Sequence, residues 1–188
     1  MAIINALIVN EGKRQKGNII VNGGLIERVI FGDAITIPSF NPQKVINAEG
    51  LILIPGVIDD HVHFREPGLT HKGDICSESK AAIAGGVTSI MDMPNTIPQT
   101  VTSEELDKKF EIASKSSLAN YSFYLGATNH NIQEIIKVDK QKVCGLKLFM
   151  GSSTGNMLVD NGESLETMFR SSPVLIGAHC EDAATVKR

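Results

Sequence analysis

From residue 57 onward, short apolar segments alternate with segments of helical periodicity, and this alternation restricts the fold more than any other feature. The five predicted strands span 57–64, 87–93, 120–126, 145–150 and 174–180. Helical patterns separate them at 78–84, 102–113, 131–137 and 163–170. Apolar strands that are each followed by a helix are typical of a parallel sheet covered by helices. The sequence therefore predicts an α/β fold.

The spacing of these units separates two parallel architectures. Val57 and Val174 lie 117 residues apart and bound four strand–helix units. This gives roughly 29 residues per unit, close to the value in a (β/α)8 barrel of about 250 residues. A doubly wound sheet has similar spacing, but no glycine-rich phosphate-binding sequence follows the first strand. We therefore expect a TIM-type (β/α)8 barrel, of which about five βα units precede Arg188.

Residues 1–54 follow a different pattern and are predicted to form a small β module, with the barrel domain covering 55–188. Strand-like segments lie at 3–9, 17–21, 25–30, 44–46 and 51–54, with a polar turn at 10–16 and a hairpin turn at 22–24. Eight units of roughly 29 residues need about 232 residues besides this module. The length of 188 residues thus predicts a barrel truncated after about strand five, and inactive by itself.

Composition excludes several classes of protein. With 42% hydrophobic and 21% charged residues, the chain has globular rather than disordered composition. Its net charge of −3 and its lack of a basic cluster argue against a surface that binds nucleic acid. Its longest apolar segment is too short to span a membrane. Without a signal peptide, Cys76, Cys144 and Cys180 are interpreted as reduced, mostly buried thiols. We expect a cytoplasmic protein that binds neither nucleic acid nor membranes.

His61 and His63 are the strongest local candidates for a functional site. They are two residues apart on the first predicted barrel strand, so both side chains point to the same side of the sheet. Active sites of TIM barrels lie at the carboxyl ends of the strands, where two neutral imidazoles can hold a metal ion. For so short a pattern, a pair of surface histidines is the alternative.

Lys147 interrupts the otherwise apolar strand 145–150, and His179 lies near the end of the fifth strand. An apolar site lowers the pKa of a lysine and exposes a reactive amine, which can take up carbon dioxide as a carbamate able to bridge two metal ions. The alternative is an edge-strand lysine whose amine reaches solvent. Both residues lie at the same strand ends as the two histidines of the first strand, and this coincidence favours a metal site.

Four segments together resemble the dihydroorotase family of the amidohydrolase superfamily. They are HVHFREPG from His61, MDMPNT from Met91, GLKLFMGSSTGNM from Gly145 and HCED from His179. The third occurs in looser form in hydantoinases and allantoinases. The resemblance spans nearly the whole chain, including the N-terminal β module. It implies a metallo-hydrolase barrel that interconverts L-dihydroorotate and N-carbamoyl-L-aspartate, a step of de novo pyrimidine biosynthesis.

The resemblance implies a role for each matching residue. His61 and His63 correspond to ligands of the more buried of two Zn²⁺ ions, and His179 to a ligand of the second. Lys147 corresponds to the carboxylated lysine that bridges both ions. Two water-activating metal ions would supply the nucleophile and polarise the amide carbonyl.

Arg65 and Asn95 match the positions that bind the substrate carboxylate in this family, beside His63. A planar guanidinium suits a carboxylate. Without the resemblance, Arg65 is interpreted as a surface ion-pair residue and Asn95 as a turn residue. The segment 151–156 suits a mobile loop over the site or a long connection.

Two further carboxylates, Glu181 and Asp182, either orient His179 or are solvated residues at a helix start. No residue of the chain is predicted to be catalytic in proton transfer, because the family uses a carboxylate from the eighth strand. The family's remaining histidine ligand is likewise expected after the sixth strand.

Two other functions stay open alongside a dihydroorotase. One is a hydantoinase- or allantoinase-type cyclic amidohydrolase, and the other is a non-catalytic, dihydroorotase-like scaffold subunit. The expected partner is a small-molecule substrate, and dimers common in the family make a homodimer an option. Binding of aspartate transcarbamoylase is a family property that no residue here establishes.

Overall fold

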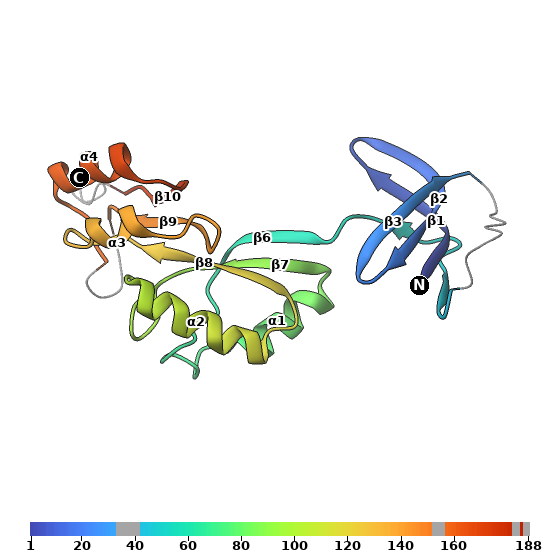
Figure 1. Cartoon of the computed structure of the whole chain (residues 1–188), viewed down its shortest axis with the longest axis horizontal. Helices are drawn as coiled ribbons and strands as arrows, with labels where there is room; N and C mark the ends of the chain where they lie inside the picture. Colours follow the sequence, from blue (N-terminus) through green and yellow to red (C-terminus); the bar gives the residue numbers. More distant parts are fainter. Residues whose placement is uncertain (33–41, 152–156, 182–184, 186–188) are drawn as a thin grey trace. The chain divides into compact units, whose positions relative to one another are not determined.

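The computed structural model describes residues 1–32, 42–151, 157–181 and 185. The chain divides into two compact units, Met1–Pro55 and Gly56–Arg188 (Figure 1). Five residues of the predicted loop, 152–156, and Asp182 lie outside the described residues. Among the helices that are described, none is long and apolar enough to cross a membrane.

The first unit is a β-sheet of five strands. They are β1 (Ala2–Asn10), β2 (Lys13–Asn22), β3 (Leu25–Phe31), β4 (Val45–Asn47) and β5 (Ile52–Leu53). Strand β1 pairs antiparallel with β2 and parallel with β4 and β5. The long turn predicted at 10–16 is wrong. Glu11 and Gly12 adopt positive φ angles of 49° and 73° and close a two-residue hairpin between Asn10 and Lys13.

The second unit contains a parallel sheet in the order β10-β9-β8-β7-β6. Its strands are β6 (Val57–Val62), β7 (Val87–Asp92), β8 (Asn120–Gly126), β9 (Val143–Phe149) and β10 (Ile176–His179). Consecutive strands are neighbours, as in a TIM barrel, and this confirms the predicted α/β fold. The alternative of an edge-strand Lys147 is wrong, because β9 lies between β8 and β10 and Lys147 is buried.

Four helices follow the strands: α1 (Ile75–Ala84), α2 (Ser103–Ser116), α3 (Ile132–Lys137) and α4 (Gly162–Ser171). The predicted start of α2 is confirmed, since Thr102 caps it by accepting a hydrogen bond from the backbone of Glu105 at 3.2 Å. Helix α1 starts three residues earlier than the predicted 78. The reason is Asp74, whose side chain accepts a hydrogen bond from Ser77 N at 2.8 Å and caps the first turn.

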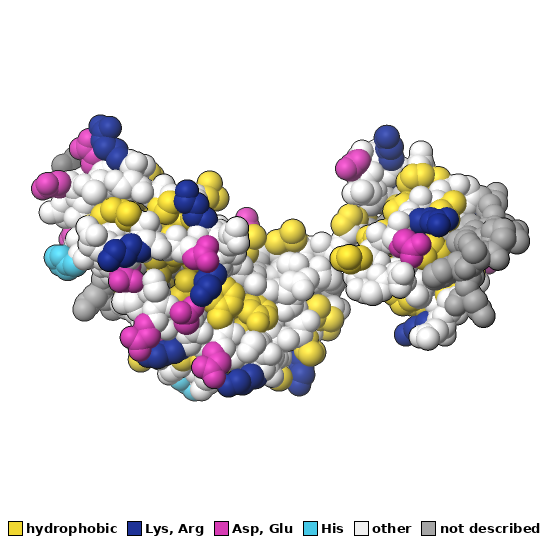
Figure 2. All heavy atoms as spheres, viewed as in Figure 1, with side chains coloured by type: hydrophobic (Ala, Val, Ile, Leu, Met, Phe, Trp, Pro, Cys, Tyr) yellow, Lys and Arg dark blue, Asp and Glu magenta, His cyan; other side chains and the backbone are white. Residues whose placement is uncertain are grey.

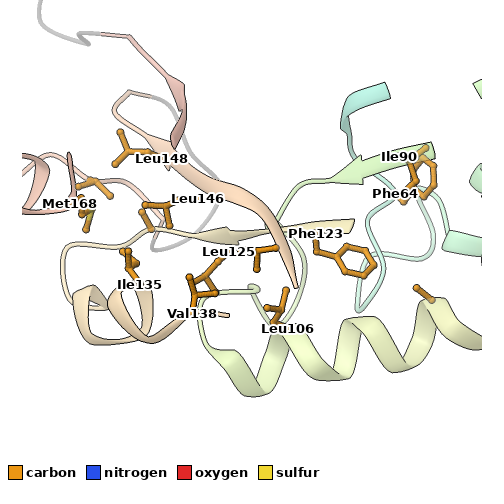
Figure 3. Close-up of a cluster of buried hydrophobic side chains, with 14 of the residues drawn as sticks. Phe64, Ile90, Leu106, Phe123, Leu125, Ile135, Val138, Leu146, Leu148 and Met168 are labelled. Carbon is orange, nitrogen blue, oxygen red and sulfur yellow. The ribbon is translucent and has the colours of Figure 1, made fainter. Parts of the chain in front are cut away.

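The main hydrophobic core lies between the sheet and the helices (Figure 3). Its fully buried side chains include Leu106, Phe123, Leu125, Ile135, Leu146 and Leu148. Charged side chains gather on the surface over α2 (Figure 2). Lys108 and Glu104 form an exposed ion pair of 2.9 Å on this helix. Because side chains alternate along a strand, residues between the core positions, such as Lys147 between Leu146 and Leu148, point to the opposite face of the sheet.

Candidate active site

Every residue of the predicted site lies at the carboxyl end of a strand of the parallel sheet. His61 lies in β6 and His63 follows it, while Asn95 comes three residues after β7. Lys147 lies two residues before the end of β9, and His179 is the last residue of β10. Since the strands run parallel, these ends share one edge of the sheet, where TIM barrels carry their active sites.

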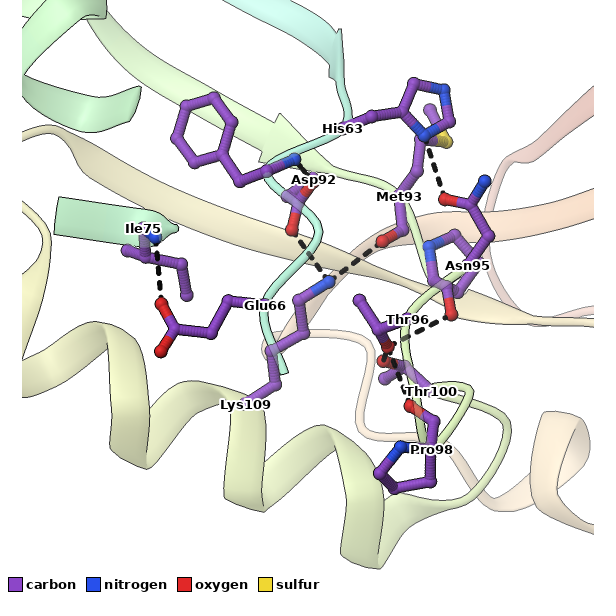
Figure 4. Close-up of polar contacts among 12 residues, drawn as sticks. His63, Glu66, Ile75, Asp92, Met93, Asn95, Thr96, Pro98, Thr100 and Lys109 are labelled. Atoms are coloured by element: carbon purple, nitrogen blue, oxygen red, sulfur yellow. Dashed lines mark hydrogen bonds and ion pairs between the residues drawn. The ribbon is translucent and has the colours of Figure 1, made fainter. Parts of the chain in front are cut away.

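His61, His63 and Asn95 form the first of two groups at this edge. The two imidazole rings lie 5.3 Å apart between centroids, with an angle of 52° between their planes. His63 Nδ1 lies 2.8 Å from Asn95 Oδ1 (Figure 4). A proton on Nδ1 would be donated to this oxygen and leave the lone pair of Nε2 free for a metal ion. The same bond leaves the Asn95 Nδ2 group to serve another acceptor.

The environment of His63 favours the neutral imidazole that binds metal. Burial lowers its pKa below the ordinary 6.5, and the hydrogen bond to Asn95 opposes this effect. The positive charges of Arg65 and His61 lower it further, whereas Asp92 raises it. At neutral pH, a smaller fraction of His63 is therefore protonated than of an ordinary histidine, and fewer protons are displaced when a metal binds.

Arg65 lies in this group with an unusual backbone conformation and an available side chain. Its φ of +69° is in the left-handed region, which arginine rarely adopts. The surrounding turn is fixed by Leu69 N donating to Arg65 O at 3.1 Å and by Ile75 N donating to Glu66 Oε2 at 2.8 Å. Among the described carboxylates, none pairs with the guanidinium, so its planar fork is available for an acidic ligand.

Lys147 and His179 form the second group. Lys147 is 4% exposed, and its amine has no hydrogen bond or ion pair with the described residues. It lies 5.0 Å from the ring centroid of Phe149, which in turn lies 6.1 Å from that of His179. Burial lowers the pKa of Lys147, and Cys180 opposes this effect. A larger fraction of this amine is therefore neutral and nucleophilic than in an ordinary lysine.

The surroundings of His179 revise two sequence interpretations. Glu181 Oε1 lies 3.6 Å from His179 Nε2, which makes it a neighbour of the imidazole rather than a purely solvated carboxylate. Cys76 and Cys144 are half-buried, but Cys180 is exposed, so the prediction that it is mostly buried is wrong. It follows β10, which has only β9 as a described neighbour and is therefore covered on one edge only.

The two groups stay separate in this structure. No three His, Cys, Asp or Glu side chains of the described segments gather closely enough to hold one metal ion. The sheet order explains this, because β6 with His61 and β10 with His179 are the two outer strands. The structure thus brings together His61, His63 and Asn95, and separately Lys147 and His179.

Comparison with known proteins agrees with this geometry. A sequence model described as "Dihydro-orotase-like" matches residues 50–187. The chain belongs to the dihydro-orotase-like family. A dihydroorotase of Methanosarcina mazei is 33% identical over 183 residues, which are 96% of this chain and 39% of the relative. An allantoinase of Deinococcus radiodurans is 35% identical over 148 residues, which are 78% of this chain and 32% of the relative.

Among solved structures, L-hydantoinase from Arthrobacter aurescens superposes with a TM-score of 0.89 at 25% identity, over 99% of this chain and 42% of that one. The match confirms that the five parallel strands form part of a TIM-type barrel and that the chain also carries an N-terminal β module. The dihydro-orotase-like chain spans about two fifths of the length of this structure and of the dihydroorotase relative.

Sequence reasoning missed two residues of this family member beside the first group, Asp92 and Lys109. They form a buried ion pair of 2.7 Å between the end of β7 and helix α2 (Figure 4). One signal could have revealed Lys109: it is three residues after Leu106 and four before Ala113, so it belongs to the buried face of α2. A charge at such a position requires a buried partner.

Proposed function

We propose that this chain supplies the zinc-binding and carboxylate-binding residues of a cyclic amidohydrolase that interconverts L-dihydroorotate and N-carbamoyl-L-aspartate in pyrimidine biosynthesis. One observation carries the proposal. Lys147 is buried without a described polar partner, at the same sheet edge as His61, His63 and His179. Membership of the dihydro-orotase-like family supports the reaction class.

The donor chemistry of these residues fits zinc, which binds imidazole nitrogen and carboxylate-type oxygen. His61 and His63 would hold one ion and His179 the other. Lys147 would contribute after carboxylation: its neutral Nζ attacks the carbon of CO₂, a C–N bond forms, and the amine loses a proton to solvent. The carbamate would then offer oxygen ligands to the metal ions. When bound, two Zn²⁺ ions would lower the pKa of water to about 7 and polarise the scissile carbonyl.

Arg65 and Asn95 would orient the substrate. The guanidinium of Arg65 can hold the ring carboxylate through two parallel hydrogen bonds, and Asn95 can donate from Nδ2. Because Asn95 Oδ1 is already bonded to His63, one amide would couple the position of the substrate to that of a metal ligand. Such orientation lowers the entropy cost of bringing the amide carbonyl to the reactive centre.

A hydantoinase- or allantoinase-type reaction is the second candidate, favoured by the allantoinase relative and the hydantoinase structure. Hydantoin carries no carboxylate. Arg65, without a described carboxylate partner, favours the acidic substrate, because a half-buried guanidinium without a counter-ion is costly unless a ligand supplies one.

Binding measurements on the purified chain test the proposal. We expect zinc titration to detect metal binding that is lost when His61 and His63 are both replaced by alanine, and calorimetry to show binding of dihydroorotate but not of uncharged hydantoin. Arg65→Gln should weaken dihydroorotate binding by roughly 10- to 100-fold, the value of a charge-assisted hydrogen-bond pair. Arg14→Gln, on the separate β unit, is the matched control. Equal binding of hydantoin would favour the second candidate, and a zinc-free chain would favour a scaffold.

A further inference from the structure

A buried ion pair lies directly beside the loop that carries His63 and Arg65. The side chain of Lys109 is 0% exposed and that of Asp92 is 1% exposed. Lys109 Nζ lies 2.7 Å from Asp92 Oδ2 and donates a hydrogen bond to Met93 O at 2.8 Å (Figure 4). The lysine thus fixes the orientation of the carboxylate and binds the backbone where β7 ends.

The second oxygen of the carboxylate reaches the other side of the site. Asp92 Oδ1 accepts a hydrogen bond from the backbone N–H of Phe64 at 2.9 Å. Phe64 stands between His63 and Arg65, and Met93 stands two residues before Asn95. The ion pair therefore holds the backbone on both sides of the hydrogen bond between His63 and Asn95.

The backbone conformation at Arg65 shows why these contacts with the loop are needed. Arg65 has a φ of +69°, and a strained residue of this kind persists only where surrounding contacts over-determine the backbone. The bond from Phe64 N to Asp92 is one of these contacts and the one adjacent to Arg65 on its N-terminal side. Without it, the peptide between Phe64 and Arg65 could relax, and the directions of the His63 and Arg65 side chains would change.

Stability by itself does not account for the pair. Buried ion pairs contribute little net stability compared with apolar residues of similar volume. An apolar pair could fill the same space, but it could not accept the hydrogen bond of Phe64. We propose that Asp92 is a positioning residue, oriented by Lys109. It fixes the Phe64 amide and thereby sets the directions of the His63 and Arg65 side chains. The inference rests on the proposed function only for what those two side chains bind.

Two double variants separate positioning from packing. Asp92→Leu with Lys109→Met makes both positions apolar and removes the acceptor for Phe64. Asp92→Asn with Lys109→Met also removes both charges but retains an oxygen acceptor. Neither leaves a buried unpaired charge, so both should fold. Leu106→Ala, on the same face of α2, controls for a general loss of stability.

Three readouts apply at a temperature where all variants are folded: hydrogen exchange of the Phe64 amide, the ¹⁵N signature of the His63 tautomer, and zinc affinity by chelator competition. With leucine at position 92, we expect faster exchange, a mixture of tautomers, and zinc affinity weaker by roughly 10- to 100-fold, as for other groups that orient metal ligands. With asparagine there, and in the Leu106 control, all three should stay close to those of the unmodified chain.

Equal exchange, tautomer and zinc affinity in the two double variants would overturn the positioning role. The first two readouts need no metal, so they judge the inference separately from the proposed function. If the unmodified chain binds no zinc but exchange and tautomer respond as expected, positioning stands and the proposed function fails. If zinc binds and none of the three readouts responds, the proposed function stands and the positioning role fails.

Discussion

Two lysines are withdrawn from solvent in the α/β unit, and the regions around them differ in one respect. Lys109 lies between β7 and α2 with Asp92 at 2.7 Å, whereas Lys147 lies over Phe149 without a polar partner in the described segments. Burial lowers the pKa of both amines, but a carboxylate opposes the effect only at Lys109. Burial by itself is therefore common to both lysines, and the counter-charge is what differs between Lys109 and the lysine proposed to be reactive.

The largest effect should follow from breaking the paired region. Lys109→Met leaves the Asp92 carboxylate buried without its cation, and we expect the free energy of unfolding to fall by about 3–5 kcal/mol. Urea unfolding measures the change. The exposed pair of Lys142 and Asp107, 3.0 Å apart, provides the control, since Lys142→Met should cost no more than about 1 kcal/mol. Equal effects of the two substitutions would show that Lys109 is not a buried structural cation.

Replacing Lys147, which has no described polar partner, should change the free energy of unfolding in the opposite direction. In the chain free of metal and bicarbonate, Lys147→Met replaces a buried amine without a partner by an apolar side chain of similar length. We expect the free energy of unfolding to rise by less than about 1 kcal/mol, because burial disfavours the charged amine but does not remove it fully from solvent. A decrease as large as that of Lys109→Met would show that Lys147 has a stabilising partner.

The stability difference between the unmodified chain and Lys147→Met should also depend on pH in the alkaline range. The pKa of Lys147 lies below 10.5 in the folded chain and near 10.5 in the unfolded chain, so between these values the unfolded state binds more protons. Stability from this group therefore rises with pH, by at most about 1.4 kcal/mol per pH unit. The advantage of Lys147→Met should shrink as the pH approaches 10.5. Cys144, whose pKa is raised to about 11, titrates in both proteins and cancels from the difference. A constant difference would contradict the lowered pKa.

The smallest effect concerns the helix that carries Lys109. Thr102→Ala removes the hydrogen bond to Glu105 N at the start of α2, and the free energy of unfolding should fall by about 1 kcal/mol. Thermal unfolding measures the change, with Thr102→Ser as the conservative control. Thr102→Ser should keep the stability of the unmodified chain, and an equal loss in both variants would show that the cap hydrogen bond does not stabilise the helix.

The sequence predicted the Lys147 region better than the Lys109 region, for physical reasons. A lysine within an apolar strand is visible as a local anomaly, as is a pair of histidines at a strand end. Lys109 follows Lys108 in a helix rich in charges, so only its helical phase relative to Leu106 distinguishes it. Its partner Asp92 comes from another element, and no local pattern records such a contact.

The backbone conformation of the loop at Arg65 and the exposure of Cys180 also could not be predicted from the sequence. Arg65, with its positive φ, follows Phe64, whose backbone N–H donates to Asp92 from another element, a contact between residues 28 positions apart in the sequence. Cys180 was expected to be mostly buried, but it is exposed, and its exposure depends on what covers β10. The strand–helix alternation, in contrast, predicted the order of the sheet, since it is local to each unit and repeated along the chain.

The central claim is that Lys147, and not Lys109, is the reactive lysine. Carbon-13 NMR of the zinc-loaded chain in ¹³C-bicarbonate tests it most directly. We expect one carbamate resonance in the unmodified chain, the same resonance in the Asp92→Asn, Lys109→Met double variant, and none in Lys147→Met. Absence of the resonance from the unmodified chain, or its survival in Lys147→Met, would contradict the claim.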